Sequence, residues 1–187
     1  MSIDTSQFRN GLKIELDGSP FVMTYFQHVK PGKGGAFVRT KVKNLLTGKV
    51  LDRTFRSGEK VQEADVEERT MQYLYLDGED RVFMDNTTYD QAPISNDVLG
   101  DARAYLKENT DVSVLFWRDK PVNIDLPPFI EVEVSECEPG IRGDTASNVT
   151  KPATIETGAT VQVPLFIKEG DTIRIDTRTR EYSERVN

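Results

Sequence analysis

The sequence predicts an all-β protein built from three small β-barrel domains. Short β-prone runs separated by glycine- and proline-containing turns recur along the 187 residues, and only one stretch has helical periodicity. Hydrophobic residues make up 37% of the chain and charged residues 29%, which is typical of a soluble protein with much surface. The expected domains are residues 1–64, 65–127 and 128–187. Domains this small have modest cores, so packing between neighbours is expected to contribute to stability.

The first domain is expected to be a small antiparallel barrel with one long hairpin. Residues 21–29 and 36–45 are β-prone, and the sequence PGKGG at 31–35 separates them. Proline fixes one φ angle and glycine permits positive φ, so this segment is predicted to be the hairpin tip. Arms of up to ten residues would project about 30 Å, at roughly 3.3 Å per residue. A turn at 47–48 then leads into a strand at 49–55.

The second domain is expected to contain two hairpins and the single helix. The helix is predicted over residues 97–108, with Ser95 or Asn96 available to cap its first turn. Its apolar residues fall on one helical face, at Val98, Leu99, Ala102, Tyr105 and Leu106. The hairpins are predicted from strands at 71–76 and 81–85 around a turn at 77–80, and from strands at 112–117 and 122–126 around a turn at 119–121.

The third domain follows a break at Pro127 and Pro128, which lack backbone donors. Residues 129–137 alternate between apolar and acidic side chains, as a half-buried strand does. Strands at 161–167 and 172–176 flank a turn at 168–171. Two successive β units of about 60 residues make the OB-fold a reasonable candidate for the second and third domains.

Charge is distributed unevenly along the chain. The total is −7, but residues 1–63 carry a net +5, residues 64–127 a net −8 and residues 128–187 a net −4. Contacts with phosphate groups need lysine and arginine. The sequence therefore predicts that the first domain approaches an anionic partner while the acidic remainder does so less closely.

Lys33 lies between glycines at the predicted hairpin tip. The neighbouring glycines remove side-chain bulk, so the tip could enter a narrow space. Local patterns leave an ordinary exposed turn lysine as the alternative. The tip is not a nucleotide-binding loop of the Walker A type, because no glycine lies five residues before Gly32 and neither serine nor threonine follows Lys33.

Three cationic residues, Arg39, Lys41 and Lys43, occupy every second position of one predicted strand. Alternate residues of a strand share a face, so their charges form a short row suited to a phosphate backbone. The alternative is an ordinary solvated strand face.

No catalytic constellation, metal site or cofactor site is predicted. The single histidine, His28, has no cysteine nearby, so a structural or surface role is expected for it. The single Cys137 has no histidine at ligand spacing, so a packing role is expected. No apolar run approaches the roughly 20 residues of a membrane span, and the N-terminus lacks a signal pattern. A cytoplasmic location and no membrane partner are therefore expected. Five aromatic residues are candidates for base stacking, although strand aromatics are more often core: Tyr73, Tyr75, Phe83, Phe116 and Trp117.

Motifs along the whole chain resemble the bacterial elongation factor P family. They occur in the family's order and span all three expected domains. They are VKPGKGGAF (29–37), VRTKVKNLLTG (38–48), YLYLDGE (73–79), VFMDNTTY (82–89), EPGIRGDTA (138–146), KPATIETGATVQVPLFI (151–167) and DTRTREY (176–182).

The resemblance implies a non-enzymatic translation factor of SH3-like, KOW-type fold followed by two OB-folds, in an elongated, tRNA-like arrangement. Family members bind the 70S ribosome between the peptidyl and exit sites, stimulate peptide-bond formation and relieve stalling at consecutive prolines. The implied partners are peptidyl-tRNA, ribosomal RNA and an enzyme that modifies the tip lysine with a β-lysyl or aminopentanol-type group. A monomer without a cofactor is expected.

The resemblance also implies roles for individual residues. Lys33 matches the modified lysine, and the tip that contacts the acceptor end of peptidyl-tRNA comprises Pro31, Gly32, Lys33 and Gly34. The segment near the exit-site codon matches Gly143, Asp144, Thr145 and Ala146. Positions near the anticodon stem match Tyr182 and Arg185.

One position departs from the family pattern, because Arg180 stands where a glycine is usual. If that glycine needs positive φ, the final turn is expected to change and the contacts of Tyr182 and Arg185 with it. An elongation factor P-like paralogue with a narrower role also lacks this glycine, but it lacks the lysine tip as well. A general OB-fold RNA-binding module is the other alternative, which the acidic charge of residues 64–187 disfavours.

Overall fold

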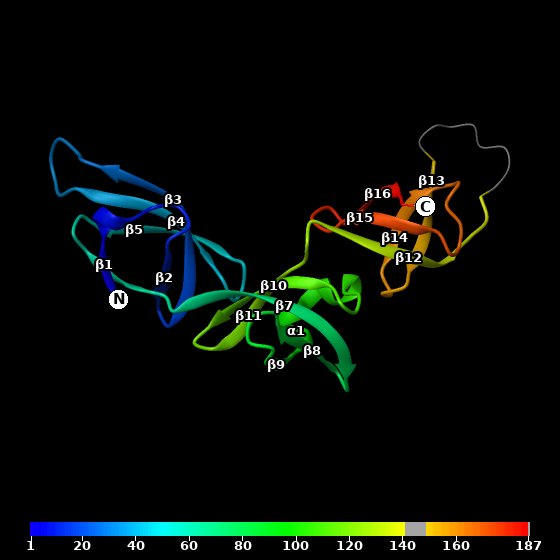
Figure 1. Ribbon diagram of the computed structural model, residues 1–187. Helices are drawn as coiled ribbons and strands as arrows, with labels where there is room; N and C mark the ends of the chain where they lie inside the picture. The colour runs from blue at the N-terminus through cyan, green and yellow to red at the C-terminus, as the bar shows by residue number, and fades with distance from the viewer. Residues whose placement is uncertain (141–148, 187) are drawn as a thin grey trace. The chain divides into compact units, whose positions relative to one another are not determined.

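The structure is a computed structural model that describes residues 1–140 and 149–186 (Figure 1). Three antiparallel sheets of six, five and five strands follow one another along the chain, which confirms the predicted all-β class. The chain divides into two compact units, Met1–Glu68 with Leu115–Asn123 and Arg69–Val114 with Ile124–Asn187. The division into three domains stays a prediction.

The first sheet has the strand order β1-β6-β2-β3-β4-β5. Its core contains Ile14, Met23, Val38, Val42 and Phe55, each at most 1% exposed. A short 3-10 helix, η1 (Thr5–Gln7), begins in a capping box formed by Asp4 and Gln7. The strands are β1 (Ser2–Asp4), β2 (Lys13–Leu16), β3 (Ser19–Val29), β4 (Phe37–Asn44), β5 (Val50–Arg56) and β6 (Lys60–Glu63).

The second sheet has the order β11-β10-β7-β8-β9. One predicted turn is displaced, because it consists of Arg118 and Asp119, both with positive φ, and Lys120 already belongs to the next strand. This two-residue loop has the positive φ angles of a type I′ hairpin turn without any glycine. The strands are β7 (Val66–Asp77), β8 (Asp80–Asp85), β9 (Gln91–Ile94), β10 (Asp111–Trp117) and β11 (Lys120–Asp125).

The single long helix predicted over 97–108 is wrong. The chain forms one turn of α-helix, α1 (Asn96–Leu99), followed by a 3-10 helix, η2 (Gly100–Tyr105). Gly100 has φ 52° and ψ −135°, which no residue of a regular helix adopts, so the helix is interrupted there. Ser95 stands at the N-cap but makes no side-chain cap hydrogen bond. The predicted apolar face still packs inward, with Leu99, Tyr105 and Leu106 buried.

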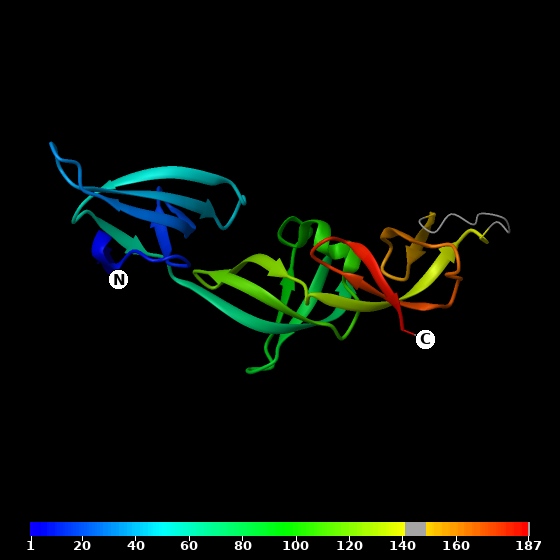
Figure 2. The same ribbon diagram turned by 90° about the horizontal axis from the view of Figure 1, so that it is seen from above.

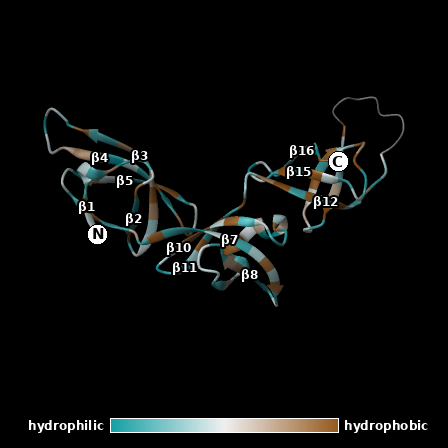
Figure 3. Ribbon diagram, in the orientation of Figure 1, coloured by the Kyte–Doolittle hydropathy of each residue, from teal (hydrophilic) through white to brown (hydrophobic). Residues whose placement is uncertain are grey.

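The third sheet has the order β14-β13-β12-β15-β16. Figure 3 shows hydrophobic and hydrophilic residues alternating along β12 and β15, and the hydrophobic set is the buried one. Ile130, Val132 and Val134 are at most 5% exposed, as the sequence alternation predicts. The strands are β12 (Phe129–Cys137), β13 (Thr150–Ile155), β14 (Thr160–Pro164), β15 (Thr172–Asp176) and β16 (Glu181–Arg185).

Candidate functional site: a lysine-tipped hairpin beside a cationic strand face

The hairpin of β3 and β4 carries Lys33 at its tip. The two strands pair as far as Val29 and Phe37, and residues 30–36 form the loop between them. Figures 1 and 2 both show this loop standing beyond the ends of the neighbouring strands of its sheet. β3 has 11 residues and β4 has 8, so the long hairpin arms predicted from the sequence are confirmed.

The backbone conformation of the loop favours glycine at one position. Gly34 has φ 112°, a conformation that side-chain-bearing residues rarely adopt. Gly32 and Gly35 do not have positive φ, and a Cβ at either would meet no atom within 4 Å. Their lack of side chains therefore leaves open space around Lys33 and is not required by the fold of the loop.

The Lys33 ammonium is exposed. Among the residues that the structure describes, it has no hydrogen-bond or ion-pair partner. A long, uncommitted, cationic side chain at the end of a paired hairpin can reach a reaction partner or a phosphate group without first breaking an internal contact.

A row of three cations runs along β4 beside the hairpin. Arg39, Lys41 and Lys43 are exposed, while the intervening Val38, Thr40 and Val42 are buried. The predicted placement of the three charges on one face is confirmed. We call this outer face of β3, β4 and β5 the cationic face.

The inner side of β4 holds the cationic face in place. Val38 and Val42 are 0% exposed in the core of the first sheet, and the Thr40 hydroxyl donates a 2.8 Å hydrogen bond to the carbonyl of Arg53. The neighbouring strand contributes one carboxylate opposite the row, Asp52, which is in register with Lys41. No ion pair joins Arg39, Lys41 or Lys43 to a carboxylate in the described residues, so their charges are available to an external anion.

An exposed tyrosine, not predicted from the sequence, also lies on the cationic face. Met23 pairs with Val42 and Tyr25 with Lys41, so Thr24 is an extra residue in a β-bulge. The Thr24 hydroxyl donates a 3.1 Å hydrogen bond to the carbonyl of Lys41. The bulge places Tyr25 opposite Lys41 with 45% of its side chain exposed. No local signal in the sequence marks this bulge.

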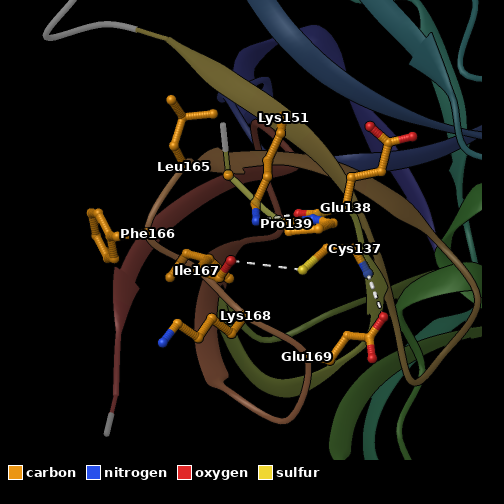
Figure 4. A pocket seen from close by; sticks show the side chains of 10 residues that line it. Cys137, Glu138, Pro139, Lys151, Leu165, Phe166, Ile167, Lys168 and Glu169 are labelled. Atoms are coloured by element: carbon orange, nitrogen blue, oxygen red, sulfur yellow. Dashed lines mark hydrogen bonds between the residues drawn. The ribbon is translucent and has the colours of Figure 1, made fainter. Parts of the chain in front are cut away.

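The predicted exit-site codon loop, Gly143, Asp144, Thr145 and Ala146, lies outside the described residues. A cavity of about 540 Å³ lies beside the described end of β12. Figure 4 shows side chains that line it, among them Cys137, Lys151 and Phe166. Lys151 is only 7% exposed, and its ammonium donates a 2.5 Å hydrogen bond to the carbonyl of Glu138. This bond ties the chain after β12 to β13.

Cys137 has a packing role, as the sequence suggests. Its thiol donates a weak 3.7 Å hydrogen bond to the carbonyl of Ile167, and its backbone N–H donates to a carboxylate oxygen of Glu169 at 3.3 Å (Figure 4). Nearby, a Cβ on Gly140 would lie 2.7 Å from the carbonyl oxygen of Leu165. The chain here approaches the segment after β14 too closely for any larger residue.

Tyr182 and Arg185 both lie on β16. Tyr182 packs against the core of the third sheet, and burial raises the pKa of its phenol. The Arg185 guanidinium is 5.5 Å from the ring centroid of Phe166 and 3.9 Å from a carboxylate oxygen of Asp171. Arg185 is therefore the exposed and partly available member of the pair, whereas Tyr182 mainly supports the strand.

The turn before β16 is the place where the sequence departs from the family pattern. Arg180 has φ 62°, so the position does have the positive φ on which the expected change of the turn depended. Its backbone N–H donates a 2.7 Å hydrogen bond to the carbonyl of Asp176. Its guanidinium lies 3.3 Å from a carboxylate oxygen of Asp101 and 5.9 Å from the ring centroid of Tyr105.

The side chain of Arg178, in the same turn, binds the Asp176 carboxylate. Two of its guanidinium nitrogens donate to the Asp176 carboxylate, at 3.0 and 2.6 Å. These bonds, with backbone donors of the turn, lower the pKa of Asp176 to about 2. The carboxylate is thus held ionised and closes the turn that Arg180 completes.

Arg180→Gly and Arg180→Ala are expected to change stability in opposite directions. Glycine removes a strain of roughly 1–2 kcal/mol for a side chain at positive φ, which outweighs an exposed ion pair of about 0–1 kcal/mol. Alanine retains the strain and loses the ion pair. Chemical denaturation should therefore show Arg180→Gly at least as stable as the parent and Arg180→Ala less stable, by up to about 1 kcal/mol. A Gly variant less stable than the Ala variant would contradict the argument.

The five candidate stacking aromatics are mostly core residues. Tyr73, Phe83 and Phe116 are at most 5% exposed and pack inside the second sheet. The Trp117 ring is covered by the guanidinium of Arg118, 4.7 Å from its centroid. Tyr75 alone of the five is exposed, at 47%.

In residues 1–140 and 149–186, no group of three or more His, Cys, Asp or Glu side chains is placed to hold a metal ion. No helix in the described part of the chain is long and apolar enough to span a bilayer.

Each of the three sheets lies largely in a segment that matches a known protein family. Residues 4–61 match the elongation factor P KOW-like domain, residues 66–124 the elongation factor P OB domain, and residues 130–185 the elongation factor P C-terminal domain. Together with the strand order, these matches define a translation factor of KOW and OB fold.

Relatives of similar length narrow the class further. An elongation factor P of Nitratidesulfovibrio vulgaris (strain DSM 19637 / Miyazaki F) is 56% identical over 95% of this chain and 96% of its own. One from Carboxydothermus hydrogenoformans is 54% identical over 98% of this chain and 100% of its own. The chain belongs to the elongation factor P family, and is thus a translation elongation factor with a ribosome-associated function.

Solved structures of a related class share the fold. "Eukaryotic translation initiation factor 5A from Methanococcus jannaschii" is 20% identical and superposes with a TM-score of 0.56 over 67% of this chain and 92% of its own. An eIF-5A family protein from Naegleria fowleri is 16% identical, with a TM-score of 0.54 over 67% of this chain and 98% of its own.

Proposed function

We propose that this factor binds the ribosome between the peptidyl and exit sites and relieves stalling at consecutive prolines. Lys33 is the residue that acts, by contacting the acceptor end of peptidyl-tRNA. The observation that carries the proposal is the exposed, unpartnered Lys33 ammonium at the end of a hairpin whose strands pair up to Val29 and Phe37. A paired hairpin delivers its tip with little conformational freedom to lose on binding.

The mechanism is positioning, without acid–base or covalent catalysis of the peptide bond. The proline nitrogen is a constrained nucleophile, and a peptidyl end that leaves its reactive geometry loses rate. A cation held against the acceptor-end backbone restricts that movement. In well-oriented systems orientation contributes up to about 7–11 kcal/mol, of which a rescue factor needs only a fraction.

Lys33 is also the proposed acceptor of a post-translational modification. Its amine is exposed and bonded to no described residue, so a modifying enzyme can reach it. A β-lysyl group joined through an amide would lengthen the arm and replace the neutralised ammonium with amines of its own. An aminopentanol-type group joined through nitrogen would lengthen the arm to a terminal hydroxyl and leave the lysine nitrogen cationic. Either change extends the reach of the tip without altering its fold.

The remaining contacts are proposed by position. Pro31, Gly32 and Gly34 flank Lys33 at the acceptor end, and the cationic face lies against RNA backbone. The segment Gly143–Ala146 approaches the exit-site codon, and Tyr182 and Arg185 approach the anticodon stem. The partners are the 70S ribosome, its RNA and prolyl peptidyl-tRNA, for a cytoplasmic monomer.

Lys33→Ala is expected to abolish the stimulation of synthesis through a triple-proline reporter. Synthesis of a proline-free reporter should be unchanged, because ordinary acceptors need no added positioning. The measurement is the rate of full-length product in a reconstituted translation system that contains either variant at equal concentration.

Lys49→Ala is the matched control, since Lys49 is an exposed lysine in the turn that leads into β5, at the other end of β4. It should behave as the parent does.

The intact mass of the natively produced protein should show an increment confined to Lys33. Full triple-proline activity of Lys33→Ala would refute the proposal, and an unmodified, active protein would favour a paralogue with a different role.

A further inference from the structure

The cationic face carries an aromatic ring that the proposed function does not use. Tyr25 is 45% exposed and stands in register with Lys41, one strand away from the row of cations. Strict alternation from Phe21 and Met23, both buried, would have put Tyr25 in the core. The bulge at Thr24 reverses the alternation and turns the ring outward.

The ring is fixed in its exposed position from two sides. The Tyr25 hydroxyl donates a 3.2 Å hydrogen bond to the amide oxygen of Gln27, its neighbour on the same face. The Thr24 side chain, bonded to the carbonyl of Lys41, holds the bulge against β4. Phe26, the next residue, is partly buried on the opposite side and packs against the core of the first sheet.

The exposed ring is not occupied by an internal partner. Several other aromatic rings of this protein lie under an arginine, including those of Phe37 and Phe129. In the part of the chain that the structure describes, no cation or second aromatic ring lies against Tyr25. Its face is therefore available to an external planar group.

We infer that Tyr25 is a stacking platform for a base of single-stranded RNA whose phosphates lie along Arg39, Lys41 and Lys43. The inference rests on the proposed function, because it takes the partner of the cationic face to be RNA. An aromatic ring beside a row of cations is the combination that single-strand binders use, since the ring accepts any base and the cations follow the backbone. Charge complementarity favours an anionic partner such as RNA, because residues 1–63 have a net charge of +5 whereas the remainder of the chain is acidic.

Tyr25 lies on the same strand that leads to the hairpin tip. Val29, where pairing with β4 ends, lies four positions after Tyr25 on β3. At roughly 3.3 Å per residue, the ring lies about 13 Å before the end of the paired strands. A strand of RNA whose 3′ end meets Lys33 would pass along the hairpin and bring an upstream nucleotide to Tyr25.

The test uses the full-length protein and a labelled RNA hairpin with a single-stranded 3′ overhang that ends in CCA. A second RNA carries abasic nucleotides in the overhang, so it offers the same phosphates without bases. Fluorescence anisotropy near 50 mM salt measures both affinities, because backbone contacts are strongest at low salt. The parent protein should prefer the RNA with bases by about 5- to 150-fold, the range for one stacked base.

Tyr25→Ala should remove this preference and leave the affinity for abasic RNA unchanged, while Tyr25→Phe should retain it. Lys41→Ala should weaken binding of both RNAs by the same factor and reduce the salt dependence. Equal preference in the parent and in Tyr25→Ala would overturn the inference. So would a Tyr25→Ala variant that binds RNA normally but is poorly modified at Lys33 in cells, because the ring would then serve a protein partner.

The outcome is separable from that of the proposed function. Lys33→Ala should keep the parent's preference for RNA with bases, since the ring and the row of cations are intact. Failure of Tyr25→Ala to change RNA binding would leave the triple-proline result for Lys33 as it stands. Full activity of Lys33→Ala on the triple-proline reporter would refute the proposed function, whatever Tyr25 does.

Discussion

Arg39→Glu, Lys41→Glu and Lys43→Glu together are expected to lower the affinity of this factor for the ribosome on the order of 100- to 1000-fold near 0.1 M salt. Each cation that neutralises a phosphate releases counterions, and the logarithm of the affinity changes with the logarithm of salt by about 0.9 per contact. Loss of three contacts therefore also reduces the salt slope by roughly 3. The measurement is equilibrium binding to purified 70S ribosomes at several salt concentrations.

The fold should tolerate these changes, because all three side chains are exposed and bonded to no carboxylate among the described residues. A charge-matched control reverses three exposed lysines outside the row of Arg39, Lys41 and Lys43, namely Lys49, Lys120 and Lys168. It has the same net charge and should lose much less affinity. If both triple variants weaken equally, net charge and not the cationic face determines binding.

The second large effect is on stability. Phe55→Ala is expected to lower the free energy of unfolding of the first sheet by about 3–5 kcal/mol. Phe55 is 1% exposed, and its ring meets that of Phe8 edge-to-face at 5.2 Å between centroids. Alanine leaves a cavity that the surrounding sheet cannot close, in a core too small to absorb the loss. Chemical denaturation measures the change, and hydrogen exchange shows where it acts.

Phe129→Ala is the control, because Phe129 is a phenylalanine with 45% exposure and should cost far less. If the domains fold separately, hydrogen exchange of the Phe55→Ala variant should show lost protection in β2, β3 and β4. Protection in β12 and β15 should be retained. Equal loss of protection in the third sheet would contradict the three-domain prediction and show that the chain unfolds as one unit.

Short-range patterns predicted much of the candidate site. The hairpin followed from two β-prone runs around PGKGG, and the row of Arg39, Lys41 and Lys43 followed from strand alternation. Both depend on backbone geometry that neighbouring residues already determine. The burial of Ile130, Val132 and Val134 followed in the same way.

Two features could not be predicted because they depend on contacts between distant residues. The helix expected over 97–108 is broken at Gly100, and Tyr105, at the end of the 3-10 helix that follows, packs in the core of the third sheet. The two-residue turn at Arg118 and Asp119 has positive φ at both positions, which nothing in those residue types requires. There the Arg118 side chain reaches Glu15 at 2.7 Å, from 103 positions away.

The amino-acid sequence is enough to predict the all-β class, the family, the lysine at the hairpin tip and the shared face of three cations. These depend on local propensity, on alternation with a period of two and on motifs that span the chain. The place of Tyr25 on that face, in contrast, depends on the pairing of β3 with β4. A single extra residue, Thr24, reverses the alternation of β3, and its place is set by hydrogen bonding to Lys41 on the paired strand.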